Sequence, residues 1–204
     1  GLMIAALAKG GAALGEERYT DGARKAADFV FQVLRLPDGR LLHRFRDGHG
    51  AVAAHLDDYA FLTWGLIELY EATFEPLCLE RALDLTDLQV RYFWDPKGGF
   101  FFTPHDGEAL PIRQKEIYDG AVPSGNSVSL LNLLKLSRIT ARHDLEEKAG
   151  WLVRTFAGRV AEFPSGHAQF LQGLDFALGP SFEVVLSGTK GQPDTEAMVT
   201  ALRK

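Results

Sequence analysis

Residues 56–94 decide the fold, and they read LDDYAFLTWGLIELYEATFEPLCLERALDLTDLQVRYFW. The first half, Leu56 to Phe74, is apolar on nearly every side of a helix, and such a helix must be buried over most of its surface. The second half, Pro76 to Trp94, carries apolar residues along one stripe and charged residues on the other, which is typical of a helix at the protein surface. We therefore expect an inner helix followed by an outer helix.

The same alternation continues along the chain on both sides of this pair. Further inner helices are expected at Leu2 to Leu14, Pro123 to Thr140 and Pro164 to Leu178, and further outer helices at Glu16 to Arg35 and Asp144 to Glu162. Repeated helical hairpins stack side by side in solenoids and closed toroids. The predicted fold class is therefore all-α, with inner and outer helical hairpins building a toroid segment over residues 1–179.

Two Gly-rich stretches follow outer helices, at Leu36 to Leu42 and at Trp94 to Phe102, and each predicts a short β-hairpin loop. Such loops return the chain from each outer helix to the next inner helix. If every outer helix runs back along its inner partner, the inner helices are parallel. Their N-termini, with unpaired N–H groups and positive dipole ends, then meet at one rim.

The two ends of the chain depart from this pattern. No capping residue precedes the apolar helix that begins at Leu2, which predicts a fragment whose toroid segment is incomplete at its N-terminus. At the other end, Phe182 to Gly188 indicates a strand and Asp194 to Lys204 a short helix, so residues 180–204 are expected to form a small α/β appendage. The adjoining stretch Ser187 to Gly191 does not match the phosphate-binding glycine patterns.

The amino-acid composition limits the classes of binding partner that we expect. The 204 residues include 22 basic and 27 acidic residues, with a formal net charge of −5 and no long run of like charge, so neither nucleic acid nor a membrane surface is expected as a partner. The longest apolar stretch is too short to span a bilayer and has no basic leader, and the single cysteine, Cys78, excludes an internal disulfide. These features predict a cytoplasmic protein.

The starts of the inner helices carry the candidate catalytic residues. Asp57 and Asp58 form a carboxylate pair, and because successive residues point in different directions, one can cap the helix while the other faces a cavity as an acid, base or acceptor. Asp119, at the entry to the next inner helix, is the candidate second acid of a two-carboxylate mechanism. The alternative is that these residues are helix caps and a turn aspartate.

Ligand-binding candidates surround the three acids. The strings Pro123-Ser124-Gly125-Asn126 and Pro164-Ser165-Gly166-His167 place Asn126 and His167 at equivalent positions of successive repeats. The full set of candidates is His55, Tyr59, Ser124, Asn126, His167 and Gln169. The alternative is that they are helix caps and core hydrogen-bonding groups, since buried polar atoms usually find protein or water partners. Aromatic residues such as Trp64 and Phe100 could line a sugar-sized cavity or belong to the core.

No metal ion or cofactor is expected. His55 and Asp57 are close in sequence, but no second histidine pair at ligand spacing completes a site. A terpenoid-cyclase function is disfavoured, because the single Asp57-Asp58 pair lacks the third aspartate of the metal-binding motif found in prenyl-diphosphate enzymes. Cys78 has no local basic partner and is interpreted as structural.

Four stretches together resemble a known family: HLDDYAF at 55–61, GLIELYEAT at 65–73, GGFF at 98–101 and DGAVPSGNS at 119–127. They resemble the helical domain of the thioredoxin-domain-containing proteins of the spermatogenesis-associated protein 20 family. The resemblance covers nearly the whole chain. It implies a larger parent protein with an N-terminal thioredoxin-like domain, followed by an (α/α)6 toroid similar to N-acylglucosamine 2-epimerases and six-hairpin glycosidases. The paired histidines on which the epimerases rely are not found in this chain.

Two functions follow as expectations. The first is a domain that binds or processes a carbohydrate-like small molecule at the inner-helix rim. The second is a non-catalytic scaffold for the thioredoxin-like domain of the parent chain. The fold analogy supplies a shape and a cavity but does not transfer chemistry.

Overall fold

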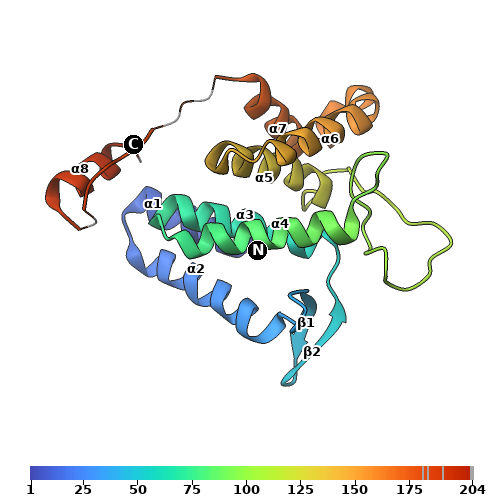
Figure 1. The fold of residues 1–204 in the computed structure, drawn as a ribbon, viewed down its shortest axis with the longest axis horizontal. Coiled ribbons are helices and arrows are strands. Elements are labelled where there is room, and N and C mark those ends of the chain that lie inside the picture. The colour runs from blue at the N-terminus through green and yellow to red at the C-terminus, as the bar shows by residue number, and fades with distance from the viewer. Residues whose placement is uncertain (181, 183, 190, 203–204) are drawn as a thin grey trace.

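The computed structural model describes residues 1–180, 182, 184–189 and 191–202, and in this part of the chain the protein is mainly helical (Figure 1). The α-helices are α1 (Leu2–Leu14), α2 (Glu17–Phe29), α3 (Leu56–Thr73), α4 (Pro76–Phe93), α5 (Gly125–Thr140), α6 (His143–Glu162), α7 (Ala168–Leu178) and α8 (Pro193–Leu202). A π-helical turn, Val30–Leu34, continues α2, and a 3-10 turn, Pro164–Gly166, precedes α7. The predicted helices are confirmed, with ends that differ by a few residues.

The helices form two layers, as the alternation predicted. Helices α1, α3, α5 and α7 pack in this order as the inner layer, while α2, α4 and α6 each cover one inner helix, namely α1, α3 and α5 (Figure 1). The inner helices supply most of the fully buried large side chains, including Leu66, Ile67, Leu69, Leu130, Leu133 and Leu136. Each buried side chain of this size contributes roughly 2 kcal/mol to the hydrophobic stabilisation. The apolar character of the inner helices is therefore what holds the layers together.

A glycine lies at each contact between neighbouring inner helices. A Cβ atom at Gly65 of α3 would lie 2.9 Å from the Gly1 carbonyl oxygen and from Ile4 Cβ of α1. At Gly125 of α5 it would lie 2.7 Å from Leu56 Cγ, and at Gly173 of α7 it would lie 2.8 Å from Leu130 of α5. These distances leave no room for a side chain, so the inner helices approach one another more closely than alanine would allow.

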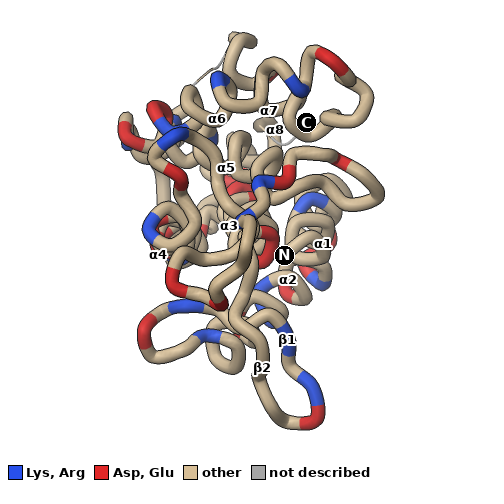
Figure 2. The backbone as a smooth tube through the Cα atoms, turned by 90° about the vertical axis from the view of Figure 1, so that its right-hand side faces the viewer, with Lys and Arg blue, Asp and Glu red and all other residues tan. Residues whose placement is uncertain are grey.

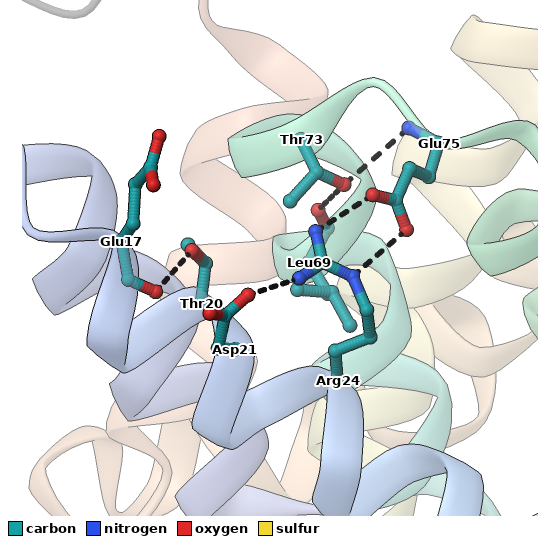
Figure 3. A network of polar contacts seen from close by, with 7 residues as sticks. All are labelled: Glu17, Thr20, Asp21, Arg24, Leu69, Thr73 and Glu75. Atoms are coloured by element: carbon teal, nitrogen blue, oxygen red, sulfur yellow. Dashed lines mark hydrogen bonds and ion pairs between the residues drawn. The ribbon is translucent and has the colours of Figure 1, made fainter.

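A polar network joins α2 to the turn between α3 and α4 (Figure 3). Arg24 donates to both carboxylate oxygens of Glu75, at 2.6 and 3.2 Å, and to Asp21 Oδ1 at 2.5 Å. Thr73 Oγ1 accepts from the Glu75 backbone N–H and donates to the Leu69 carbonyl. The bidentate arginine–carboxylate pair adds directional contacts to a helix that otherwise packs mainly on α1.

The first predicted β-hairpin loop is closed by one antiparallel bridge, but the paired strands lie after it. Residues 35–41 form a loop closed by one bridge between Arg35 and Leu41, and the strands follow it as β1 (Leu42–Arg46) and β2 (His49–Ala53). They pair antiparallel, with Leu42 opposite Ala53 and Arg46 opposite His49. The connecting Asp47-Gly48 has positive φ at both residues, 52° and 80°, which is the backbone of a tight hairpin turn. The second predicted hairpin, at 94–102, is likewise a loop with a single bridge, between Trp94 and Phe100.

The predicted strand at 182–188 is incorrect as far as it is described. Residues 182 and 184–188 have no strand structure, and Phe182 and Val185 are largely exposed, because no neighbouring strand is present in the described residues to pair with them. Ser181, Glu183, Lys190, Arg203 and Lys204 lie outside the described residues. Helix α8 confirms the helical part of this prediction, and Figure 1 places it to one side of the helical layers.

Charged residues of both signs are interspersed along the backbone, as the absence of a long run of like charge predicts (Figure 2). Within the described residues, no helix combines the length and the apolar character that crossing a bilayer requires.

Candidate functional site

The starts of α3, α5 and α7 meet at one rim, as predicted from the parallel arrangement of inner helices. The Asp119 carboxylate joins two of them: Oδ1 accepts from the Ser124 backbone N–H at 2.9 Å, and Oδ2 accepts from those of Gln169 and Phe170 at 2.9 and 3.1 Å. The start of α3 lies against the start of α5, because Gly125 is in contact with Asp57 and Leu56. Three groups of polar residues from distant parts of the sequence therefore share this rim.

Asn126 holds the long loop between α4 and α5 against the rim. Its side chain is fully buried, and it accepts from the Phe100 backbone N–H at 2.8 Å and donates to the carbonyls of Phe100 and Glu116 at 2.9 and 2.8 Å. Since these bonds use the amide oxygen and both amide hydrogens, Asn126 acts within the protein as a structural bracket.

Other predicted ligand-binding residues also bond within the protein. Ser124 caps α5 by accepting from the Ser127 backbone N–H, and Tyr59 Oη accepts from the Leu41 backbone N–H at 3.0 Å. His167 is buried, and its Nδ1 lies 3.0 Å from the Ile117 carbonyl oxygen. Because a carbonyl can only accept, this contact places the proton on Nδ1.

Asp57 is the acid with the most perturbed environment. Its Oδ1 is buried and has no hydrogen-bond partner within the part of the chain that the structure describes. Burial raises the pKa of this carboxyl group to about 6, Asp58 and Glu116 add to the rise, and the Gly125 backbone amide opposes it. A carboxyl group with this pKa can hold or release a proton near neutral pH, which is the property that a general acid or base needs.

Asp58 occupies a different position from its neighbour. Its Oδ2 accepts from the His55 backbone N–H at 2.8 Å, which caps α3, and it lies 2.9 Å from His43 Nδ1 on strand β1. His55 Nδ1 lies 3.9 Å from the same oxygen, and its ring stacks on Phe102. Asp58, a predicted catalytic residue, and His55, a predicted ligand-binding residue, thus meet His43, which was not among the predicted site residues.

An open depression of about 290 Å³ lies beside the rim, on the side of α1 and α7. It is lined by Leu2, Trp64, Asp119, Gly120, Pro123, Ala168, Gln169 and Gln172. Two of the predicted site residues, Asp119 and Gln169, are in this lining. The side-chain Nε2 of Gln169 is buried and has no hydrogen-bond partner among the described residues.

Trp64 connects the depression to a charged cluster deeper between the helices. Its indole N–H donates to Glu68 Oε1 at 2.9 Å, and this buried carboxylate also pairs with Lys9 at 3.3 Å and Lys135 at 3.2 Å. Burial lowers the pKa of Lys135, but Glu71 and Glu68 outweigh it, and the net shift is upward. The lysine therefore stays charged, and the ion pairs fix Glu68 and, through it, the plane of Trp64.

The sequence pattern predicts the rim but not all of the residues that line the depression. Gln172 and the apolar wall of Leu2 and Pro123 were not selected, because a glutamine or a proline in a helical pattern gives no signal of facing a depression. His43 was missed because it lies 12 residues before His55, on a hairpin that was predicted elsewhere.

Comparison with known proteins identifies relatives for nearly the whole chain. No family model matches it. The chain is 36% identical over 210 residues to spermatogenesis-associated protein 20 from Homo sapiens, and the match covers 98% of this chain and 27% of that protein. The chain thus spans about a quarter of the length of this relative. The predicted resemblance is confirmed by this homology.

Two solved structures share the fold. A cellobiose 2-epimerase from Bacillus thermoamylovorans superposes with a TM-score of 0.61 at 16% identity, covering 76% of this chain and 42% of the epimerase. A GH76 α-mannanase from Bacteroides thetaiotaomicron gives a TM-score of 0.57 at 17% identity, covering 74% of this chain and 41% of the mannanase. At these identities the likeness concerns the fold alone, and it confirms the α/α toroid architecture.

Proposed function

Because this chain is homologous to a segment of spermatogenesis-associated protein 20 and folds as part of an α/α toroid, we propose that it binds a carbohydrate-like small molecule in the depression beside the inner-helix rim. The two structural neighbours are named as enzymes that act on cellobiose and on a mannan, so the same architecture is used for sugars elsewhere. The proposal concerns this segment, and the activity and partners of the whole parent protein are likewise proposals.

One observation carries the proposal: the depression combines an aromatic ring with a polar side chain that has an unused donor. The Trp64 indole N–H is already bonded to Glu68, which leaves the ring as an apolar surface. Gln169 supplies an amide whose Nε2 lacks a partner among the described residues. Small-molecule sites typically pair apolar and aromatic walls with a few polar groups that orient the ligand. A sugar offers both C–H faces and hydroxyl acceptors for such a pair.

The volume limits the ligand to a small one. A depression of about 290 Å³ lies at the lower end of the range for small-molecule pockets, so we expect it to take one sugar ring. Gln169 and Gln172 orient the hydroxyl groups in this proposal. Asp119 fixes the backbone around them, since its oxygens already accept three N–H groups.

If the bound ligand also reacts, Asp57 is the proposed general acid or base, because it is the rim carboxyl group with a pKa near neutrality. Asp57 does not line the depression, so this role requires a ligand that extends along the rim toward the start of α3. Asp58 accepts hydrogen bonds at the start of α3, and Asp119 acts as a positioning residue. His55, Tyr59, Ser124, Asn126 and His167 maintain the shape of the rim. The parent protein's thioredoxin-like domain and its cytoplasmic location remain predictions from the resemblance and the composition.

The alternative function is a non-catalytic scaffold for that thioredoxin-like domain. It is favoured by the number of rim groups that bond internally, with Asn126 the clearest case. The scaffold function does not explain why Gln169 Nε2 and Asp57 Oδ1 are buried without a hydrogen-bond partner among the described residues.

Calorimetric titration with a panel of neutral monosaccharides and disaccharides tests the proposal. We expect saturable binding to the 204-residue chain and at least about a tenfold loss of affinity in Gln169→Leu, because a lost hydrogen bond from a buried donor costs roughly 1–2 kcal/mol. Gln32→Leu, on the exposed turn after α2, is the matched control and should bind as the parent does. If no sugar binds, or if both variants lose affinity equally, the scaffold is the better account.

A further inference from the structure

His43, His55 and Asp58 form a cluster at the start of α3, where the proposed function gives His55 and Asp58 structural roles only and His43 none. We propose that these three residues form a binding site for a divalent transition-metal ion, with Zn²⁺ the best match. The site is separate from the sugar proposal, because none of the three residues lines the depression.

The three residues already present ligand atoms to one another. His43, His55 and Asp58 each offer one atom, and these atoms all lie within 4.8 Å of one another. His43 Nδ1 lies 2.9 Å from Asp58 Oδ2, and His55 Nδ1 lies 3.9 Å from it. Ligands bound to one Zn²⁺ at about 2.0–2.1 Å in a tetrahedron are roughly 3.4 Å apart, so small side-chain rotations would bring all three to bonding distance.

Two of the ligands are held in place by contacts that do not involve the ligand atoms of the other two side chains. The His55 ring stacks on Phe102 with its centroid 4.7 Å away and the two planes 15° apart. The Asp58 carboxylate is fixed by the His55 backbone N–H at 2.8 Å. His43 comes from strand β1, and its ring lies edge-on to His55 with the centroids 5.3 Å apart. Neighbouring groups that orient metal ligands raise affinity because less freedom is lost on binding.

The donor set favours a particular class of ion. Two imidazoles and one carboxylate suit Zn²⁺ and its first-row neighbours better than Ca²⁺ or Mg²⁺, which prefer oxygen ligands. Three protein ligands leave a fourth position for water or another small ligand. The side chains of His55 and Asp58 are 29% and 25% exposed and that of His43 is 49% exposed, so an ion can enter from solvent.

Binding would have a structural consequence. The ion would replace the contact between His43 and Asp58 with two coordination bonds, joining the β1–β2 hairpin to the first turn of α3. We therefore expect metal binding to stabilise the folded state, since an ion that binds only the folded chain raises its stability by mass action.

The test is a titration of the metal-free 204-residue chain with Zn²⁺. Calorimetry measures the binding, and the melting temperature measures its effect on stability. We expect one ion per chain, a rise in melting temperature that a chelator reverses, and a visible absorption spectrum of four- or five-coordinate Co²⁺ when Co²⁺ is used as the probe. His43→Gln should weaken binding by at least about tenfold. This half-exposed residue is chosen because Asp58→Asn would also remove a helix cap.

The matched control is His143→Gln. His143 is 91% exposed at the start of α6, with a nearby carboxylate, Glu146, at 4.0 Å, but it is outside the cluster. It should bind Zn²⁺ like the parent chain. If the parent chain binds no ion, or if His143→Gln weakens binding as much as His43→Gln does, the metal site is overturned and the cluster is a hydrogen-bonded pair only. A sugar-binding result does not change either outcome.

Discussion

Asp119 Oδ2 accepts a hydrogen bond from the backbone N–H of Gln169, at 2.9 Å and across 50 residues of sequence. The other oxygen of the same carboxylate accepts from Ser124 at the start of α5. One side chain therefore holds the starts of two inner helices together, at a place where each helix presents N–H groups without a partner of its own.

Asp119→Asn should destabilise the fold because its amide presents a donor, rather than an acceptor, to one of these helix starts. We expect the free energy of unfolding to fall by about 2 kcal/mol, as is typical when hydrogen bonds to a charged group are lost. Urea unfolding of both proteins measures the difference. Asp175→Asn, on an exposed position of α7, is the control and should change stability by less than about 0.5 kcal/mol. Equal effects of the two changes would show that Asp119 has no special structural role.

We expect the loss of stability on replacing each of the two asparagines of α5 to follow the number of hydrogen bonds that its side chain makes. Asn126 makes three hydrogen bonds to backbone groups of other segments, whereas Asn132 is also buried but donates one, to the Ala60 carbonyl. We expect Asn126→Ala to cost about 3 kcal/mol and Asn132→Ala about 1 kcal/mol, because buried groups left unpaired carry a desolvation penalty. Thermal and urea unfolding of both variants measure the order, and a reversed order would contradict the bracket role of Asn126.

Alanine at two helix glycines should have effects of opposite sign. A Cβ at Gly125 would lie 2.4 Å from Asp57 Oδ1, so Gly125→Ala should cost about 2 kcal/mol through overpacking between α3 and α5. A Cβ at Gly150 of α6 meets nothing within 4 Å, so Gly150→Ala should stabilise the protein by about 0.5–1 kcal/mol through helix propensity. Melting temperatures of the two variants provide the measurement. A gain in stability from Gly125→Ala would mean that the inner helices can separate.

The raised pKa of Asp57 predicts how the free energy of unfolding depends on pH. Its pKa of about 6 in the folded protein lies above the ordinary value of 3.8, so the folded state binds this proton more tightly than the unfolded state. The resulting stabilisation is fully present below about pH 4 and is lost as the pH rises through 6. At pH 8 the ionised group is unfavourable, and we expect Asp57→Asn to be more stable than the parent by about 1 kcal/mol, a value reduced for its partial solvent exposure.

Urea unfolding between pH 4 and 8, in buffer with a chelator, measures this difference. The advantage of Asp57→Asn should shrink as the pH falls toward 4, while the exposed Asp175→Asn control should follow the parent at every pH. A constant difference between Asp57→Asn and the parent across this range would contradict a raised pKa.

The helical architecture could be predicted from the sequence because its signal is periodic and long. The inner helix at 56–74 and the outer helix at 76–94 differ in how their apolar residues are spread, and each was located to within one residue at either end. The rim followed from chain direction alone, since an outer helix that returns along its partner leaves the inner helices parallel.

The short β elements could not be located as well. The Asp-Gly pairs at 38–39 and 47–48 carry the same turn signal, but of these only the pair at 47–48 joins two paired strands. At residues 182–188 the apolar and β-branched residues favour a strand, but a strand also needs a neighbour to pair with, and the sequence pattern does not supply one.

The roles of the site residues depended on contacts that no local pattern contains. Sequence placed Asp57, Asp58 and Asp119 at helix starts, but it could not show that Asp119 reaches a second helix or that the Oδ1 atom of Asp57 is buried without a hydrogen-bond partner among the described residues. Similarly, His43 and Asp58 are brought together by the path of the hairpin, which is a tertiary feature.

The glycines at the three crossings of inner helices have a geometric consequence for the whole assembly. Where neighbouring units are spaced more closely on one layer than on the other, each unit is rotated slightly relative to the last, and a row of them bends into an arc. Gly65, Gly125 and Gly173 allow a small inner spacing, so we expect the row to bend toward α1, α3, α5 and α7. Bulkier residues at these positions should push the inner helices apart, and the rim beside the depression should widen with them.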